Sequence, residues 1–109
     1  NHGIPQMSKY VRHKKKDDNH KEIQAHFERC GAGVKDVSSL TDFVDILITY
    51  AGVAVAVEVK DGEKAPSSRK LTAGELDFKN YWEAHGGKWA LVESIKDADG
   101  LIESIAERS

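Results

Sequence analysis

A chain of 109 residues, of which 39% are hydrophobic and 31% charged, is suited to one soluble domain with one modest core. The formal net charge of −2 argues against a protein that coats nucleic acid by charge alone, but it is compatible with a local basic patch. No apolar run approaches the ~18–20 residues of a membrane span, so we expect no contact with a membrane.

The N-terminus is expected to lie outside the fold. Residues 1–16 read as a polar and then basic arm, and residues 17–109 as a single folded domain. Met7 is a candidate native start, which would make the preceding residues a leader added for expression. The sequence shows no signal peptide, and Cys30 is the single cysteine, so we expect no internal disulfide and a cytoplasmic location.

The first expected helix lies within residues 17–33, where an aspartate can cap its start and a glycine can end it. Apolar or half-apolar side chains recur there at helical spacing, at Ile23, His26, Phe27 and Cys30. None of the five histidines shows a zinc-like spacing with the cysteine or with another histidine, so we expect no structural zinc.

A short strand is expected within residues 34–42, and two longer strands follow at 44–50 and 53–60. Both longer runs are rich in β-branched residues, and Ala51-Gly52 between them predicts a β-hairpin.

The second half of the chain alternates helices with one strand. Thr72 and Glu75 form the T-x-x-E pattern of a capping box at the start of a helix that Gly86-Gly87 ends. A last strand follows at 88–94 and a last helix at 96–108. The whole order predicts an α/β layer fold in which the last strand, after a crossover helix, lies parallel to a hairpin strand.

The hairpin predicts a cluster of charges at the end of an apolar strand. A turn at Ala51-Gly52 places Asp45 opposite Glu58, although a bulge would shift that register. Opposed like charges are destabilising, so the two carboxylates call for a cation. Lys60, on the same strand face as Glu58, supplies part of that charge, and oxygen ligands favour Mg²⁺ or Mn²⁺ for the rest.

Such a site suits phosphodiester hydrolysis, because a divalent metal polarises a phosphate oxygen and lowers the pKa of a bound water. A nearby ammonium can orient that water or stabilise the charge that develops on phosphorus. The E-x-K tripeptide alone is more often a plain ion pair at a strand end. The opposed aspartate therefore carries the prediction of a metal site.

These motifs resemble the PD-(D/E)XK nuclease superfamily, and more specifically the small VRR-NUC nucleases of phage and bacteria. The resemblance rests on DILITY, VEVKDG, KLTAGELDFKNYW and KWALVES in this order, and it covers about residues 17–105. It implies a mixed β-sheet with a central hairpin, flanked by helices in the order α-β-β-β-α-β-α. It also implies a set of catalytic and metal-binding residues: Asp45, Glu58, the Val59 carbonyl, Lys60 as the catalytic lysine and Glu22 from the first helix.

Three points stay open at this stage. The Gly-x-Pro that precedes the aspartate in the family is Asp42-Phe43-Val44 here, which makes Asp42 a rival ligand to Asp45. The helix glutamine of the family is Glu75, whose capping role competes with a contact to the site. Without the resemblance, Glu22 reads as an exposed helix residue that cannot be told from Glu28.

Basic side chains that precede the first two expected helices are candidate phosphate contacts, with a solvated loop or tail as the alternative. They are Arg12, Lys14, Lys15 and Lys16 in the arm, and Arg69 and Lys70 before the second helix.

The favoured function is a metal-dependent DNA endonuclease. A domain this small has little surface for reading base sequence, so branched or otherwise structured DNA, such as junctions and flaps, is the expected substrate. Symmetric junctions need two active sites, so a homodimer with resolvase-like behaviour is expected. Two alternatives are an inactive nucleic-acid-binding module on a nuclease fold and a sequence-reading restriction or homing-type endonuclease.

Overall fold

The structure is a computed structural model that describes residues 18–108, so the predicted N-terminal arm lies outside the described residues. The described chain runs through helices, strands and one short 3₁₀ turn in the order that the sequence predicts. These are α2 (His20–Arg29), β1 (Gly33–Asp36), β2 (Ile46–Tyr50), β3 (Val53–Val59), η1 (Pro66–Arg69), α3 (Ala73–Ala84), β4 (Trp89–Val92) and α4 (Ile95–Arg108).

The four strands form one mixed sheet in the order β1-β2-β3-β4. β2 and β3 are an antiparallel hairpin that pairs Tyr50 with Val53 and Ile46 with Val57, which confirms the predicted register. Ala51 and Gly52 have φ values of 49° and 80°, the positive pair of a type I′ turn, whose twist matches that of the strands. β4 returns parallel to β3, as predicted for a strand that follows a crossover helix.

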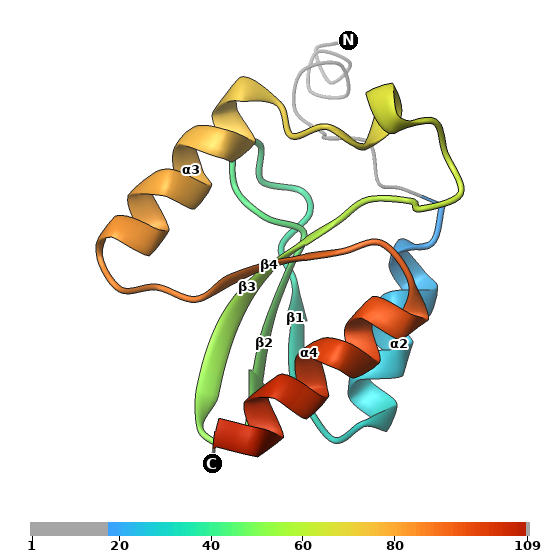
Figure 1. Cartoon of the computed structure of the whole chain (residues 1–109), viewed down its shortest axis with the longest axis vertical. Coiled ribbons are helices and arrows are strands. Elements are labelled where there is room, and N and C mark those ends of the chain that lie inside the picture. Colours follow the sequence, from blue (N-terminus) through green and yellow to red (C-terminus); the bar gives the residue numbers. More distant parts are fainter. Residues whose placement is uncertain (1–17, 109) are drawn as a thin grey trace, which may run out of the picture.

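α2 and α4 pack side by side and share the hydrophobic core with the sheet, whereas α3 stands apart from both (Figure 1). Along β3, the valines of one face belong to this core, so Ala54, Ala56, Glu58 and Lys60 face the other side. The largest fully buried apolar side chains of this core are Ile23, Phe27, Ile46, Val57, Val59 and Val92. Each contributes roughly 1.5–3 kcal/mol through burial.

α3 is fixed at its start by the predicted capping box and along its length by aromatic contacts. The Thr72 side chain accepts the Glu75 N–H, and the Glu75 side chain accepts the Thr72 N–H. Phe78 contacts Phe43 edge-on at 4.8 Å, which joins the helix to the loop before β2. Phe78 also stacks on Trp82 at 5.4 Å. The helix is thus held over the C-terminal end of β3 by its first turn and its rings.

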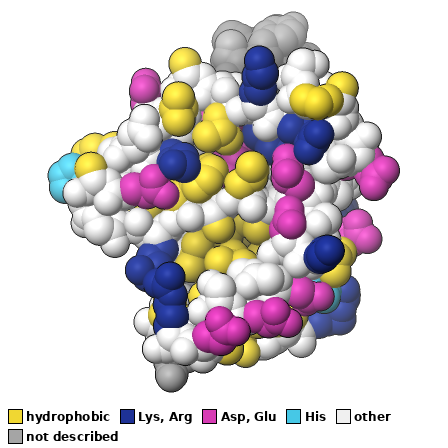
Figure 2. Space-filling model, in the orientation of Figure 1, with side chains coloured by type: hydrophobic (Ala, Val, Ile, Leu, Met, Phe, Trp, Pro, Cys, Tyr) yellow, Lys and Arg dark blue, Asp and Glu magenta, His cyan; other side chains and the backbone are white. Residues whose placement is uncertain are grey.

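Apolar side chains gather in a hollow between α3 and α4 (Figure 2). The pocket there is lined by Val53 and Val55 of β3, Trp89 of β4, and Leu101 and Ile105 of α4, with Lys88, Ser104 and Arg108 beside them. Within residues 18–108, no helix has the length and apolar character needed to cross a membrane.

Candidate active site

Strand β3 ends in charged residues that are almost wholly removed from solvent. Glu58 is 1% exposed and Lys60 is 8% exposed. Burial of an isolated charge costs several kcal/mol, so each must be compensated by an opposite charge or by hydrogen bonds. The end of β3 is therefore the place in the described chain where a functional site has an evident physical signature.

Lys60 is the cation between two carboxylates. Its Nζ donates to Glu75 Oε1 at 3.0 Å and lies 3.5 Å from Glu58 Oε2. Its backbone N–H donates to the Val92 carbonyl, which continues the pairing with β4 past the last residue of the strand. The ammonium is thus held in one position by the sheet at its backbone and by α3 at its tip.

Asp45 lies beside this cluster, but not in the predicted pairing opposite Glu58. The ladder ends at Ile46, and the Asp45 N–H donates to Val57, the residue that Ile46 already faces. A β-bulge is the arrangement in which two residues of one strand lie opposite a single residue of the neighbouring strand. The 4% exposed Asp45 side chain reaches β3 through Oδ2, which accepts the Val59 N–H at 2.8 Å.

Glu75 performs two roles with one oxygen. Oε1 accepts both the Thr72 N–H, which completes the capping box, and the Lys60 ammonium. Burial alone raises the pKa of the Glu75 carboxyl. Hydrogen bonds with the Thr72 amide, Lys60 and Glu58, together with the charge of Lys60, outweigh burial and hold this pKa below its ordinary 4.5. The capping role and the contact to the site do not compete, contrary to the sequence-based expectation.

Glu22 is not brought together with the other predicted site residues. It is exposed on α2, and no hydrogen bond or ion pair among the described residues joins it to Asp45, Glu58 or Lys60. Asn19 makes the link from this helix instead. Its Nδ2 donates to the Lys60 and Glu93 carbonyls, at 3.2 Å each.

Asn19 occupies the N-cap position of α2, where the sequence predicted an aspartate, and its side chain caps nothing in the helix. A side-chain amide at a helix start normally reads as a cap, so the sequence held no signal for a contact to the end of β3.

Asp42, the rival ligand, points elsewhere. It is exposed, has a φ of 55°, and its carboxylate lies against Gly74 in the first turn of α3, where a Cβ would overlap it. A carboxylate near the first turn of a helix is stabilised by the exposed N–H groups there. The geometry therefore favours Asp45 over Asp42 as the carboxylate beside Glu58.

Among the predicted phosphate contacts, Arg69 and Lys70 differ in environment. Arg69 is half-buried, donates to the Lys64 carbonyl at 2.9 Å and lies 3.4 Å from Glu93. Lys70 is exposed. The four basic residues of the arm, Arg12, Lys14, Lys15 and Lys16, lie outside the described residues.

The mixed sheet, its central hairpin, the flanking helices and the charged end of β3 define a nuclease fold of the PD-(D/E)XK type. No family model matches the chain, and no curated protein does. A solved structure described as "VRR_NUC domain" is similar to it, with 26% sequence identity and a TM-score of 0.61, over 78% of this chain and 95% of the other. This similarity confirms the resemblance to VRR-NUC domains that the sequence motifs indicate.

Proposed function

We propose that this protein is a metal-dependent DNA endonuclease that hydrolyses phosphodiester bonds at the end of β3. The observation that carries the proposal is the buried Lys60, held between Glu58 and Glu75 and next to the buried Asp45. A plain surface ion pair between Glu58 and Lys60 would be exposed, and this one is not. Nuclease folds of this type commonly use a divalent metal, which supports the same conclusion.

The donor set fits a hard divalent ion. Asp45 and Glu58 would hold it with the Val59 carbonyl, and all three offer oxygen atoms, the ligands that Mg²⁺ and Mn²⁺ prefer. When bound, such an ion supplies polarisation of a phosphate oxygen and a lowered pKa for a nearby water.

The protein's own side chains supply a positive charge at the site and hold it in position. Lys60, paired with two carboxylates, places a positive charge where negative charge develops on the phosphate. Glu75 fixes the ammonium because its own position is set by the capping box of α3. Glu22 enters the proposal through the family resemblance alone, as an exposed carboxylate that a bound metal or DNA would have to recruit.

Structured DNA is the proposed substrate class, and a homodimer the proposed assembly. A single domain of this size offers little surface for reading bases, whereas shape recognition needs few contacts. Lys70 and Arg69 are proposed to contact phosphates together with the arm residues Arg12, Lys14, Lys15 and Lys16. A symmetric junction requires two cuts, which a two-fold dimer would provide.

The proposal is tested with labelled duplex, flap and four-way-junction DNA, incubated with Mn²⁺, Mg²⁺ or EDTA. We expect cleavage that requires the ion, prefers a branched substrate and is lost in Asp45→Asn. Binding of the junction without cleavage under every condition would make the protein a binding module on a nuclease fold. Equal cleavage of all three DNAs would leave the activity in place and overturn the preference for structure.

A further inference from the structure

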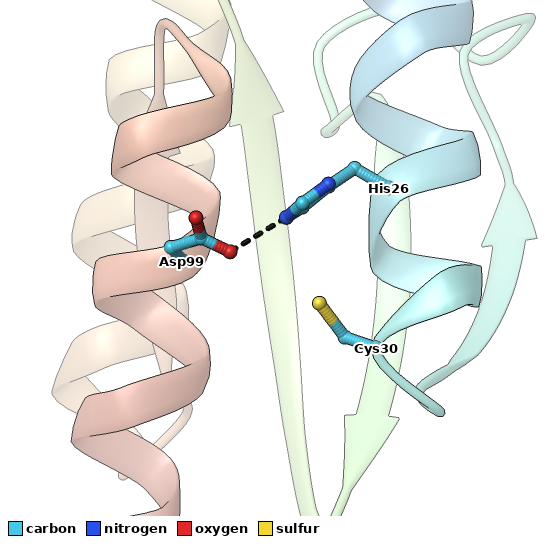
Figure 3. Close-up of side chains that lie close together, drawn as sticks. All are labelled: His26, Cys30 and Asp99. Atoms are coloured by element: carbon cyan, nitrogen blue, oxygen red, sulfur yellow. Dashed lines mark hydrogen bonds and ion pairs between the residues drawn. The ribbon is translucent and has the colours of Figure 1, made fainter.

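The packing of α2 against α4 brings together three side chains that can ligate a metal. His26 and Cys30 project from α2 toward Asp99 of α4 (Figure 3). One ligand atom from each, imidazole nitrogen, sulfur and carboxylate oxygen, lies within 4.8 Å of the other two. His26 Nε2 and Asp99 Oδ1 are already 2.6 Å apart.

The arrangement follows from helix geometry. Residues four apart lie one above the other on a helix, so His26 and Cys30 share the face of α2 that looks toward α4. The helices are fixed by the core beneath them, where Ile23 and Phe27 of α2 and Ala98 of α4 are all fully buried. His26 in the last turn of α2, Cys30 at its C-cap and Asp99 on α4 therefore hold three ligand atoms near one another.

The site lies at the rim of the core, where an ion can enter. The His26 side chain is 18% exposed, Cys30 is half-buried, and the Asp99 side chain is 54% exposed. A cysteine that only filled the core would not need a histidine and a carboxylate beside its sulfur. A simple ion pair between His26 and Asp99 explains two of the three groups and leaves the position of the thiol without a role.

The donor chemistry selects a different ion from the one proposed at the end of β3. Thiolate and imidazole favour Zn²⁺, with Zn–S and Zn–N distances of about 2.3 and 2.0 Å, whereas Mg²⁺ takes oxygen ligands. Tetrahedral coordination at those distances places ligand atoms roughly 3.3–3.6 Å from one another. Small side-chain rotations that open the histidine–aspartate contact and draw in the sulfur are therefore sufficient.

We propose that His26, Cys30 and Asp99 form a zinc site that cross-links the first and last described helices. Binding converts the Cys30 thiol to a thiolate, whose proton passes to solvent, and a water completes the four ligands. The site is distinct from the proposed active site, since His26 lies seven residues, about 10 Å of helix, from Asn19, which contacts the end of β3. The inference does not depend on nuclease activity.

The proposal departs from the sequence-based expectation that no structural zinc is present. The spacing of His26 and Cys30 is one helical turn, and their third partner lies far along the chain, on α4. Sequence spacing alone cannot show that partner, because it depends on how α2 and α4 pack.

The direct test is titration of the full chain with Co²⁺, which reports thiolate coordination by a charge-transfer band in the near ultraviolet and tetrahedral geometry by visible bands. We expect both signals, their displacement by Zn²⁺, and a Zn²⁺-dependent rise in Tm of about 5 °C or more. Cys30→Ser should abolish the charge-transfer band, and His26→Gln and Asp99→Asn should each weaken Zn²⁺ binding at least about tenfold.

Two controls separate the site from other metal sites and from a plain ion pair. His85→Gln, on an exposed histidine of the α3 C-terminus, and Asp45→Asn should both retain the Co²⁺ bands. If wild type shows no charge-transfer band, or if Cys30→Ser binds Zn²⁺ as tightly as wild type, the three residues are no zinc site. A loss of Tm in Asp99→Asn that is equal in Zn²⁺ and in EDTA would identify an ion pair only.

Discussion

The Lys60 ammonium lies 3.0 Å from Glu75 Oε1, so the end of strand β3 is joined to the first turn of α3 by a buried charged hydrogen bond. The same Glu75 oxygen accepts the Thr72 N–H that starts the helix. The position of the proposed catalytic lysine is therefore coupled to the formation of α3. A helix cap and an active-site contact share one carboxylate.

Glu75→Gln tests that coupling. Glutamine keeps an acceptor for the capping box but removes the charge that faces Lys60, so we expect a folded protein destabilised by about 1–3 kcal/mol. The matched control is Glu83→Gln on the same helix, which removes the charge of the surface pair with Lys79 and should cost no more than about 0.5 kcal/mol. Urea unfolding of both variants measures the difference, and equal costs would contradict a buried role for Glu75.

The pH dependence of the free energy of unfolding also tests the contribution of the Glu75 charge. The pKa of Glu75 is lower in the folded protein than its ordinary 4.5, so its ionised form stabilises the fold above that value. As the pH falls, the Glu75 carboxyl of the unfolded chain is protonated at a higher pH than that of the folded protein, which favours unfolding. The stabilisation is lost completely once the pH has fallen through the folded-state pKa. We expect the stability gap between wild type and Glu75→Gln to narrow steadily below about pH 4.5. A gap that stays constant from pH 7 down to pH 3 would show that the charge contributes nothing.

Two glycine-to-alanine changes should have opposite effects. A Cβ at Gly87 would lie 2.5 Å from the Trp82 indole, whose N–H donates to the Lys88 carbonyl, so Gly87→Ala should destabilise the protein by about 1–3 kcal/mol. Gly100 lies inside α4 with open space around it, and Gly100→Ala should stabilise by about 0.5–1 kcal/mol. Thermal unfolding with tryptophan fluorescence measures both. A neutral Gly87→Ala would mean that Trp82 is not packed as described.

Local sequence patterns predicted much of the fold because they join residues that are near in sequence. Positive-φ residues at 51 and 52 set the register of β2 against β3, and Thr72 with Glu75 set the start of α3. The parallel return of β4 followed from a general rule of crossover handedness and length. These features need no knowledge of distant contacts.

The parts that sequence reasoning missed depend on packing between distant segments. Asp45 lies outside the β2–β3 ladder, its carboxylate accepts the Val59 N–H, and alternation along a strand cannot predict such a bulge. Glu22 lies on the exposed face of α2, because it is about 100° around the helix from the buried Ile23. The contacts of Asn19 could not be predicted, because its two acceptors, the Lys60 and Glu93 carbonyls, lie far along the chain.

The most direct test of the active-site assignment is single-turnover cleavage of the preferred DNA by Lys60→Gln. Glutamine keeps hydrogen-bonding capacity and removes the charge, and Lys96→Gln, on an exposed lysine of α4, is the matched control. After both variants are shown to be folded, we predict a rate at least about 100-fold below wild type for Lys60→Gln and an unchanged rate for Lys96→Gln. If folded Lys60→Gln cuts as fast as wild type, the buried lysine is a structural partner of Glu58 and Glu75, and the proposed active site is wrong.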